Sequence, residues 1–195
     1  MKVLTIGLVL IGIFIVFQSF IAINAVKTEK QKYRTVLKDD ALEIRYYPSA
    51  TMATIYSSAT NYKSVASSGF GKLARFIFGG NNENESIAMT APVALQKDGG
   101  SYRVSFMMPH KYTLETLPKP NNKSIKILSL PKEKYAVIVF SGLVRESSYQ
   151  EKEKLLNEFI KGKKLNPSGE INIARYNPPW TLPFFRRNEL MLKVN

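Results

Sequence analysis

The sequence predicts an α+β domain built from two similar ββαββ units, preceded by an N-terminal transmembrane helix. The repeat is visible in the prolines, since Pro48 and Pro131 lie 83 residues apart and Pro92 and Pro178 lie 86 residues apart. Each half also places a stretch of helical periodicity between strand-like runs, which is typical of a duplicated α+β domain. A charge-free stretch at residues 3–23 predicts the membrane helix.

A helix of residues 3–23 is long enough to cross a bilayer, because 21 helical residues span roughly 30 Å. A cleaved signal peptide with Ala25 at the cleavage site is the alternative. The apolar run is longer than a usual signal-peptide core of about 7–15 residues, which favours an uncleaved anchor. We therefore divide the chain into an anchor or signal at 1–26, a basic linker at 27–38 and a domain at 39–195.

The side of the membrane on which the domain lies can be argued in two directions. The basic linker residues, at positions 27, 30, 32 and 34, outnumber Lys2 and favour a cytoplasmic domain. A single N-terminal anchor followed by a large folded domain is commonly exported. Of the two, we slightly favour the exported, periplasmic side.

The first half is expected to fold as two strands, a helix and two closing segments. Its strand-like runs are rich in β-branched and aromatic residues, with Pro48 at the break between the first two. Gly69 and Gly71 inside the helical stretch indicate a helix that depends on tertiary packing or admits a close neighbour. The expected elements are strands at 41–49 and 51–58, a helix at 60–78, a proline-containing segment at 87–96 and a strand at 102–109.

The second half repeats this order. Ser147 or Ser148 is expected to cap its helix, and Gly162 to end it. The expected elements are strands at 124–132 and 135–142, a helix at 147–161, a proline-containing segment at 171–179 and a strand at 188–194.

Composition and single residues exclude several kinds of site. The chain has no cysteine, which excludes disulfides, thiolate metal sites and cysteine nucleophiles. The only histidine, His110, is interpreted as a solvated loop residue rather than a general base or metal ligand. Met89, Met107 and Met108 are interpreted as core residues rather than soft metal ligands.

The net charge favours an anionic partner, since 28 Lys+Arg stand against 15 Asp+Glu. The lysines of 147–161 alternate with glutamates as on an ordinary solvated helix, so no nucleic-acid partner is predicted. Arg186 and Arg187 are neighbours, and on an extended backbone their side chains leave opposite faces. One of them can reach an anion while the other pairs with an acid such as Glu189.

Three motifs resemble the SOUL/haem-binding protein family. They are "LEIRYYP" at 42–48, "IAMTAPV" at 87–93 and "RYNPPWTLPFFRRNEL" at 175–190. The resemblance covers about residues 36–194. It implies a distorted antiparallel β-barrel or sheet with two flanking helices and an internal duplication. It also implies a tetrapyrrole carrier or buffer, with a shallow apolar groove between the first helix and the C-terminal proline-rich loop.

The family groove maps onto six residues, three from the helix and three from the loop: Ser67, Phe70, Ala74, Trp180, Phe184 and Arg186. The resemblance implies haem or another tetrapyrrole bound by apolar burial, stacking on Trp180 and salt bridges to the propionates, without a strong axial ligand. Two alternatives stay open. One is a hydrolase acting on a small hydrophobic molecule in the same groove, which needs a buried acid of raised pKa such as Glu43. The other is a protein-interaction module.

Overall fold

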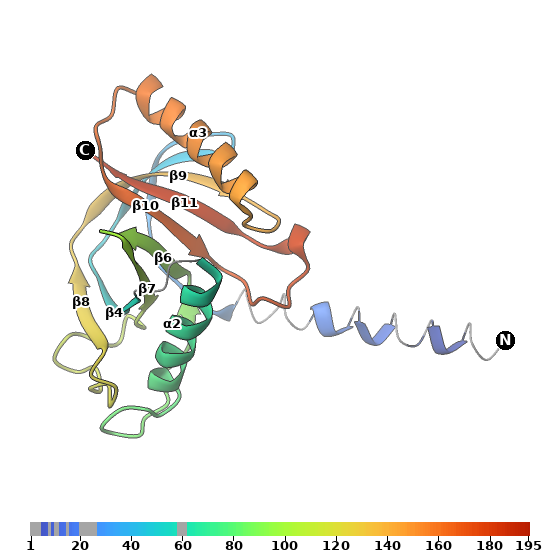
Figure 1. Ribbon diagram of the computed structural model, residues 1–195, viewed down its shortest axis with the longest axis vertical. Coiled ribbons are helices and arrows are strands. Elements are labelled where there is room, and N and C mark those ends of the chain that lie inside the picture. The colour runs from blue at the N-terminus through green and yellow to red at the C-terminus, as the bar shows by residue number, and fades with distance from the viewer. Residues whose placement is uncertain (1–4, 8, 10–11, 15, 20–26, 58–61) are drawn as a thin grey trace.

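The computed structural model describes residues 5–7, 9, 12–14, 16–19, 27–57 and 62–195, without the side chains of residues 62–64, 66–67 and 98. These residues form a large antiparallel sheet and two long helices (Figure 1). The strands are β1 (Glu29–Lys30), β2 (Arg34–Asp39), β3 (Leu42–Tyr47), β4 (Ala50–Ser57), β5 (Thr90–Ala91), β6 (Val93–Asp98), β7 (Ser101–Met107), β8 (Ile125–Leu130), β9 (Glu133–Phe140), β10 (Pro167–Arg175) and β11 (Asn188–Val194). The helices are α2 (Tyr62–Ile77), α3 (Glu146–Gly162) and the 3-10 turn η1 (Pro183–Phe185).

The order of the strands confirms the predicted duplication. Within the described residues the main sheet has nine strands in the order β2-β3-β9-β11-β10-β6-β7-β4-β8, and every neighbouring pair is antiparallel. The part of this order from β3 to β8 is symmetric. It reads the same from either end once β3 is exchanged with β8, β4 with β9, β6 with β10 and β7 with β11. A pseudo-twofold axis therefore passes between β6 and β10, where Leu95 pairs with Ile173.

The first two strands of each half, β3 with β4 and β8 with β9, do not pair with each other. β3 pairs with β9 of the other half, and β4 pairs with β8. A two-residue hairpin needs positive φ in its loop, and the loops here begin with Pro48 or Pro131, whose ring holds φ near −65°. The chain therefore forms no hairpin at Pro48 or Pro131. Instead, β3 and β4 of the first half pair with β9 and β8 of the second half.

The short connections also curl the sheet. β3 and β4 stand second and eighth in the strand order, yet only residues 48–49 join them. Three Cα–Cα steps reach at most about 11 Å, so the two ends of the sheet must approach each other. No pairing joins β2 to β8 among the described residues. The distorted barrel implied by the resemblance is thus corrected to an open, curled sheet.

The two faces of the sheet differ because side chains alternate along a strand. Leu190 and Leu192 of β11 belong to the main core, whereas Met191 between them belongs to a small cluster on the other face. α2 packs on β4 and β7, and α3 packs on β9 and β11. Both helices therefore cover the apolar face (Figure 1), and the opposite face has no helix among the described residues.

Two sequence expectations are revised by this topology. "TAPV" precedes β6 and "NPPW" follows β10, so the two motifs are not equivalent by the repeat. They meet instead at one end of the sheet, where Val93 pairs with Arg175. Part of the expected linker belongs to the sheet, because residues 34–39 form β2 and pair with β3.

The expected N-terminal anchor at 3–23 includes positions outside the described residues, namely 3–4, 8, 10–11, 15 and 20–23. Among the residues that are described, no helix is both long and apolar enough to span a membrane.

The glycines of α2 supply a matched test of its packing. A Cβ at Gly69 would lie 2.8 Å from Cγ2 of Val104 and 3.3 Å from Cγ2 of Ile55, whereas a Cβ at Gly71 meets no atom within 4 Å. Gly69→Ala should lower the free energy of unfolding by about 1–3 kcal/mol through overpacking. Gly71→Ala should leave it unchanged or raise it by up to about 1 kcal/mol through helix propensity. Urea unfolding of both variants checks this, and equal effects would contradict close packing at Gly69.

Candidate functional site

The loop at residues 176–187, called here the aromatic loop, joins β10 to β11. Arg186 holds its shape, because Nε donates to the carbonyl oxygen of Thr181 at 2.7 Å and Nη2 donates to that of Pro179. The N–H of Gly142, which follows β9, donates to the carbonyl oxygen of Pro183 at 2.9 Å. The loop is therefore fixed both internally and against the second half of the sheet.

This fixed backbone presents aromatic rings to the outside. Trp180, Phe184 and Phe185 are 60%, 65% and 61% exposed, and the two phenylalanine rings lie 4.5 Å apart. Thr181 between them is buried. Large apolar side chains on a short, well-held loop are unusual on a solvated surface and indicate a binding surface.

The helix positions predicted for the groove are described only in part. Phe70 is 37% exposed, and its ring lies 5.2 Å from that of Phe106 in β7. Ala74 is half-buried, and the side chain of Ser67 lies outside the described residues. The site drawn from α2 and the aromatic loop together stays a prediction, since no contact between the side chains described in these two elements joins them.

One half of the expectation for the arginine pair is confirmed, because Arg187 pairs with Glu189. Arg187 donates to Oε1 of Glu189 from Nη2 at 2.6 Å and from Nε at 3.0 Å. Arg186 binds loop carbonyls instead of an anion. Arg187 therefore ties the aromatic loop to β11, and Arg186 closes the loop on itself.

Glu189 belongs to a buried charge cluster on the helix-free face. Arg45, which is fully buried, donates to Oε1 of Glu189 at 3.0 Å, to Oε2 of Glu43 at 2.6 Å and to the hydroxyl of Tyr47 at 3.0 Å. Its Nη2 has no hydrogen-bond partner in the described part of the chain, but the Tyr33 ring centroid lies 4.1 Å from its Cζ. With Arg187, the cluster contains two cations and two anions and is formally neutral.

The cluster favours the ionised form of Glu43. Burial alone would raise the pKa of Glu43, but the hydrogen bond and charge of Arg45, together with Lys38 and Arg187, lower the net pKa below its ordinary value. The hydrolytic alternative named Glu43 as an example of an acid with a raised pKa, and the lowered pKa does not fit Glu43 to that role.

The tyrosines of the cluster stay protonated. Burial, followed by the charge of Glu189, raises the pKa of Tyr47 and of Tyr176 well above the ordinary value. The Tyr176 hydroxyl donates to Oε2 of Glu189 at 2.9 Å. Sequence reasoning missed this cluster, although the alternation of Glu43, Arg45 and Tyr47 in β3 was a signal, because three polar groups on one strand face are seldom left without partners.

Two hollows lie elsewhere on the protein. A cavity of about 40 Å³ on the helix-free face is lined by residues of both halves, including Tyr47, Met52, Tyr135 and Asn172. A groove of about 280 Å³ runs past the end of β7 and is lined by residues including Lys32, Met107, His110 and Glu115. Of the residues predicted for the family groove, the five with described side chains line neither hollow.

His110 contacts Glu29, and the three methionines considered as metal ligands lie in or against the core. The His110 backbone N–H donates to Oε1 of Glu29 at 2.9 Å, and its Nδ1 contacts the same oxygen. Met107 and Met108 are buried, and Met89 packs on the core, as predicted. The described residues contain no group of three His, Cys, Asp or Glu side chains able to hold a metal ion.

Comparison with known proteins adds a family and a fold. A family model described as SOUL heme-binding protein matches residues 28–193. No curated protein matches the chain. The crystal structure of the EcmrR C-terminal domain is similar at a TM-score of 0.60 and 10% identity, covering 84% of this chain and 98% of that one. A crystal structure of a hydrolase from Listeria innocua is similar at 0.56 and 10% identity, covering 82% of this chain and 94% of that one. At such identities, these similarities concern the fold alone.

Acid denaturation tests the charge cluster. Glu43→Gln should lower the free energy of unfolding at neutral pH by about 1.5–3 kcal/mol, because the partner of buried Arg45 loses its charge. The stabilisation from ionised Glu43 is present above its unfolded pKa near 4.5 and disappears as pH falls through the lower folded value. Wild type should therefore lose more stability than the variant on acidification.

Glu158→Gln is the matched control, since Glu158 makes only an exposed ion pair with Lys154 at 3.9 Å. Its effect should stay below about 1 kcal/mol. Urea unfolding at several pH values measures all three proteins. Parallel pH profiles for wild type and Glu43→Gln would refute the assignment.

Proposed function

The chain belongs to the SOUL heme-binding protein family, and from that membership we propose that it binds haem or a related tetrapyrrole as a carrier or buffer, without catalysis. We place the binding site at the aromatic loop because Trp180, Phe184 and Phe185 are exposed there. A flat apolar macrocycle is the kind of ligand that such rings bind, because stacking buries both surfaces.

The residues present fit the apolar part of a tetrapyrrole. Burial contributes about 25 cal/mol per Å² of apolar surface, so a few exposed rings can supply useful affinity. The residues proposed to hold the macrocycle are Ser67, Phe70 and Ala74 of α2 with Trp180, Phe184 and Arg186 of the aromatic loop. Bound haem would bring the redox and ligand-binding chemistry of its iron. No strong axial ligand is proposed, because His110 pairs with Glu29 away from these residues.

Arg186 is the proposed partner of the propionates. Two of its guanidinium nitrogens already bind the carbonyl oxygens of Thr181 and Pro179, which sets the guanidinium beside Trp180. A charge-assisted hydrogen bond to a carboxylate is among the stronger polar contacts available to a protein. The same side chain would thus shape the loop and select for a carboxylate-bearing ligand.

Binding without catalysis is supported by the state of the buried acids. Glu43, the acid named as an example for the hydrolytic alternative, pairs with Arg45 at 2.6 Å and has a lowered pKa. A carboxylate in a neutral ion cluster is poorly suited to donate a proton in general acid catalysis at neutral pH.

The N-terminal segment 3–23 is proposed as a membrane anchor, with the domain on the exported side. This rests on the uncharged sequence of 21 residues. The basic residues that follow it, beginning at Lys27, would lie next to the headgroups.

Haem titration of matched phenylalanine variants tests where the ligand binds. Phe184 and Phe78 are similarly exposed, at 65% and 66%, but Phe78 follows the end of α2 and is outside the proposed site. Phe184→Ala should weaken haem about tenfold, since burying a phenylalanine ring contributes about 1.5–3 kcal/mol. Phe78→Ala should bind like wild type.

The titration uses the full-length chain in detergent and follows haem absorbance and the fluorescence of Trp180, the only tryptophan. Equal losses in the two variants would place the ligand elsewhere. A wild-type chain whose absorbance and fluorescence do not respond to micromolar haem would refute tetrapyrrole binding.

Two ligands separate the roles of Arg186. Arg186→Ala should weaken haem roughly tenfold more than it weakens iron octaethylporphyrin, which lacks carboxylates, because a hydrogen bond to a charged group contributes about 1.5–3 kcal/mol. Absorbance titrations of both ligands measure the difference. If both ligands lose affinity equally, Arg186 only shapes the loop.

A further inference from the structure

The exposed rings of the aromatic loop adjoin the N-terminal apolar segment. The side-chain amide of Gln18 donates to the carbonyl oxygen of Trp180, and its Oε1 accepts from the N–H of Leu182, both at 3.4 Å. The loop and residue 18 are 162 and 164 positions apart in sequence at these two contacts. In Figure 1 the described part of the N-terminal segment leads away from the curled sheet on the side where η1 lies.

The position of Gln18 within the N-terminal segment determines how deep the aromatic loop would lie in a membrane. The expected membrane segment, residues 3–23, ends five residues after Gln18. With a helical rise of 1.5 Å per residue, position 18 of a membrane-spanning helix would lie about 8 Å from the end of that helix. The hydrocarbon core is about 30 Å thick and is flanked by the interfacial regions. A loop that contacts Gln18 would therefore lie about 8 Å inside the end of that helix, close to the boundary between headgroups and hydrocarbon.

The exposed side chains of the loop suit that boundary. Trp180 combines an apolar ring system with an N–H donor, and tryptophan is enriched at membrane interfaces for this reason. Phe184 and Phe185, whose tilted rings lie 4.5 Å apart, add apolar surface beside it. The described residues of the N-terminal segment also expose apolar side chains, which include Ile13, Phe14 and Phe17.

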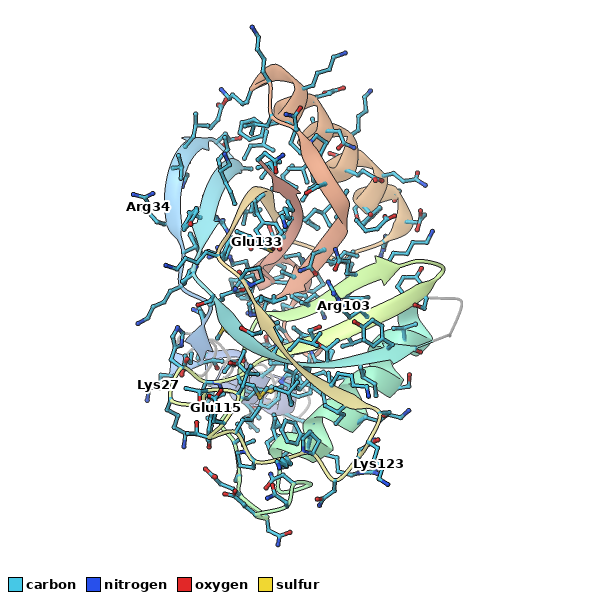
Figure 2. The ribbon with its side chains drawn as sticks, turned by 90° about the vertical axis from the view of Figure 1, so that its left-hand side faces the viewer. Lys27, Arg34, Arg103, Glu115, Lys123 and Glu133 are labelled. Atoms are coloured by element: carbon cyan, nitrogen blue, oxygen red, sulfur yellow. The ribbon has the colours of Figure 1, made fainter. Side chains whose placement is uncertain are left out.

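Basic residues accompany the apolar surface. Lys27, Lys30, Lys32 and Arg34 follow the apolar segment and are exposed, and Glu29 is the one acid among residues 27–34. Figure 2 shows Lys27 and Arg34 on the same side of the molecule, with Arg34 pointing away from its body. Each lysine or arginine near an anionic surface contributes about 1 kcal/mol of attraction. The charge therefore complements a bilayer that contains anionic lipid.

We propose that the aromatic loop is a second contact with the membrane, which places Trp180, Phe184 and Phe185 in the interface of a phospholipid leaflet containing anionic lipid. The inference rests on the proposed N-terminal anchor and deepens the proposed function. The surface proposed to hold a tetrapyrrole faces the leaflet, so its ligand is a flat apolar molecule that arrives from the lipid rather than from water.

The single tryptophan reports on this contact without a label. The full-length chain, free of haem, is reconstituted into phosphatidylcholine–phosphatidylglycerol vesicles carrying a nitroxide either near the headgroup or deep in the acyl chain. We expect Trp180 emission to shift to shorter wavelength relative to the chain in detergent-free denaturant. Quenching by the shallow nitroxide should exceed quenching by the deep one, and iodide in the water should quench weakly.

Two variants separate the loop from the anchor. Phe184→Ser with Phe185→Ser should float with the vesicles but lose most of the lipid quenching of Trp180, because the loop has lost apolar surface. Gln18→Ala should also float and should increase iodide access to Trp180, because the loop is released from the segment.

Failure of this inference is distinct from failure of haem binding. A wild-type chain that floats with the vesicles, while Trp180 responds to iodide and to neither nitroxide, would overturn the loop contact and leave the anchor in place. A chain that does not float would overturn both membrane contacts. Haem binding is measured separately in detergent, so the result of that titration does not depend on the membrane contact of the loop.

Discussion

The connections of two residues at 48–49 and 131–132 impose the constraint on which the rest of the architecture depends. Each joins strands that lie far apart in the sheet order, β3 to β4 and β8 to β9. Because so short a link reaches only about 11 Å, the sheet must curl until its ends approach. The curl gives the helix-free face a concave side where residues of both halves meet, and it explains how a face without a helix holds buried polar groups.

The buried charge cluster is the consequence of that concave face, and it links the core to the surface. Arg45 in β3 and Glu189 in β11 are both fully buried and pair at 3.0 Å, and Arg187 reaches the same carboxylate from the aromatic loop. Isolated charges at this depth would cost several kcal/mol each, so the cluster must remain complete. Arg187 thus fixes the loop at one end while Arg186 closes it internally, and Trp180, Phe184 and Phe185 are exposed on the loop so held.

This separation of charged core and apolar surface is what the proposed binding function would use. The ionisable groups are neutralised in the core and serve the fold, whereas the surface that remains for a ligand is apolar and aromatic. Such a surface takes up flat molecules with little demand on exact polar geometry. Contact between the same loop and the apolar N-terminal segment, through Gln18, suggests that ligand and lipid share one side of the molecule.

The sequence by itself determined the elements, their duplication and the family, because periodicity, strand propensity and motif spacing are local or repeat at a constant interval. The helices at 60–78 and 147–161 correspond to α2 and α3, and "RYNPPWTLPFFRRNEL" marked the loop that carries Trp180. Only the tertiary structure decided how the halves combine. These features are the strand exchange, the open curl, the places of "TAPV" and "NPPW" in the sheet, and the cluster of Arg45 with Glu189. They depend on contacts between residues up to 144 positions apart. Such partners depend on chain-length limits and on the cost of burying charge, and neither can be read from a local pattern.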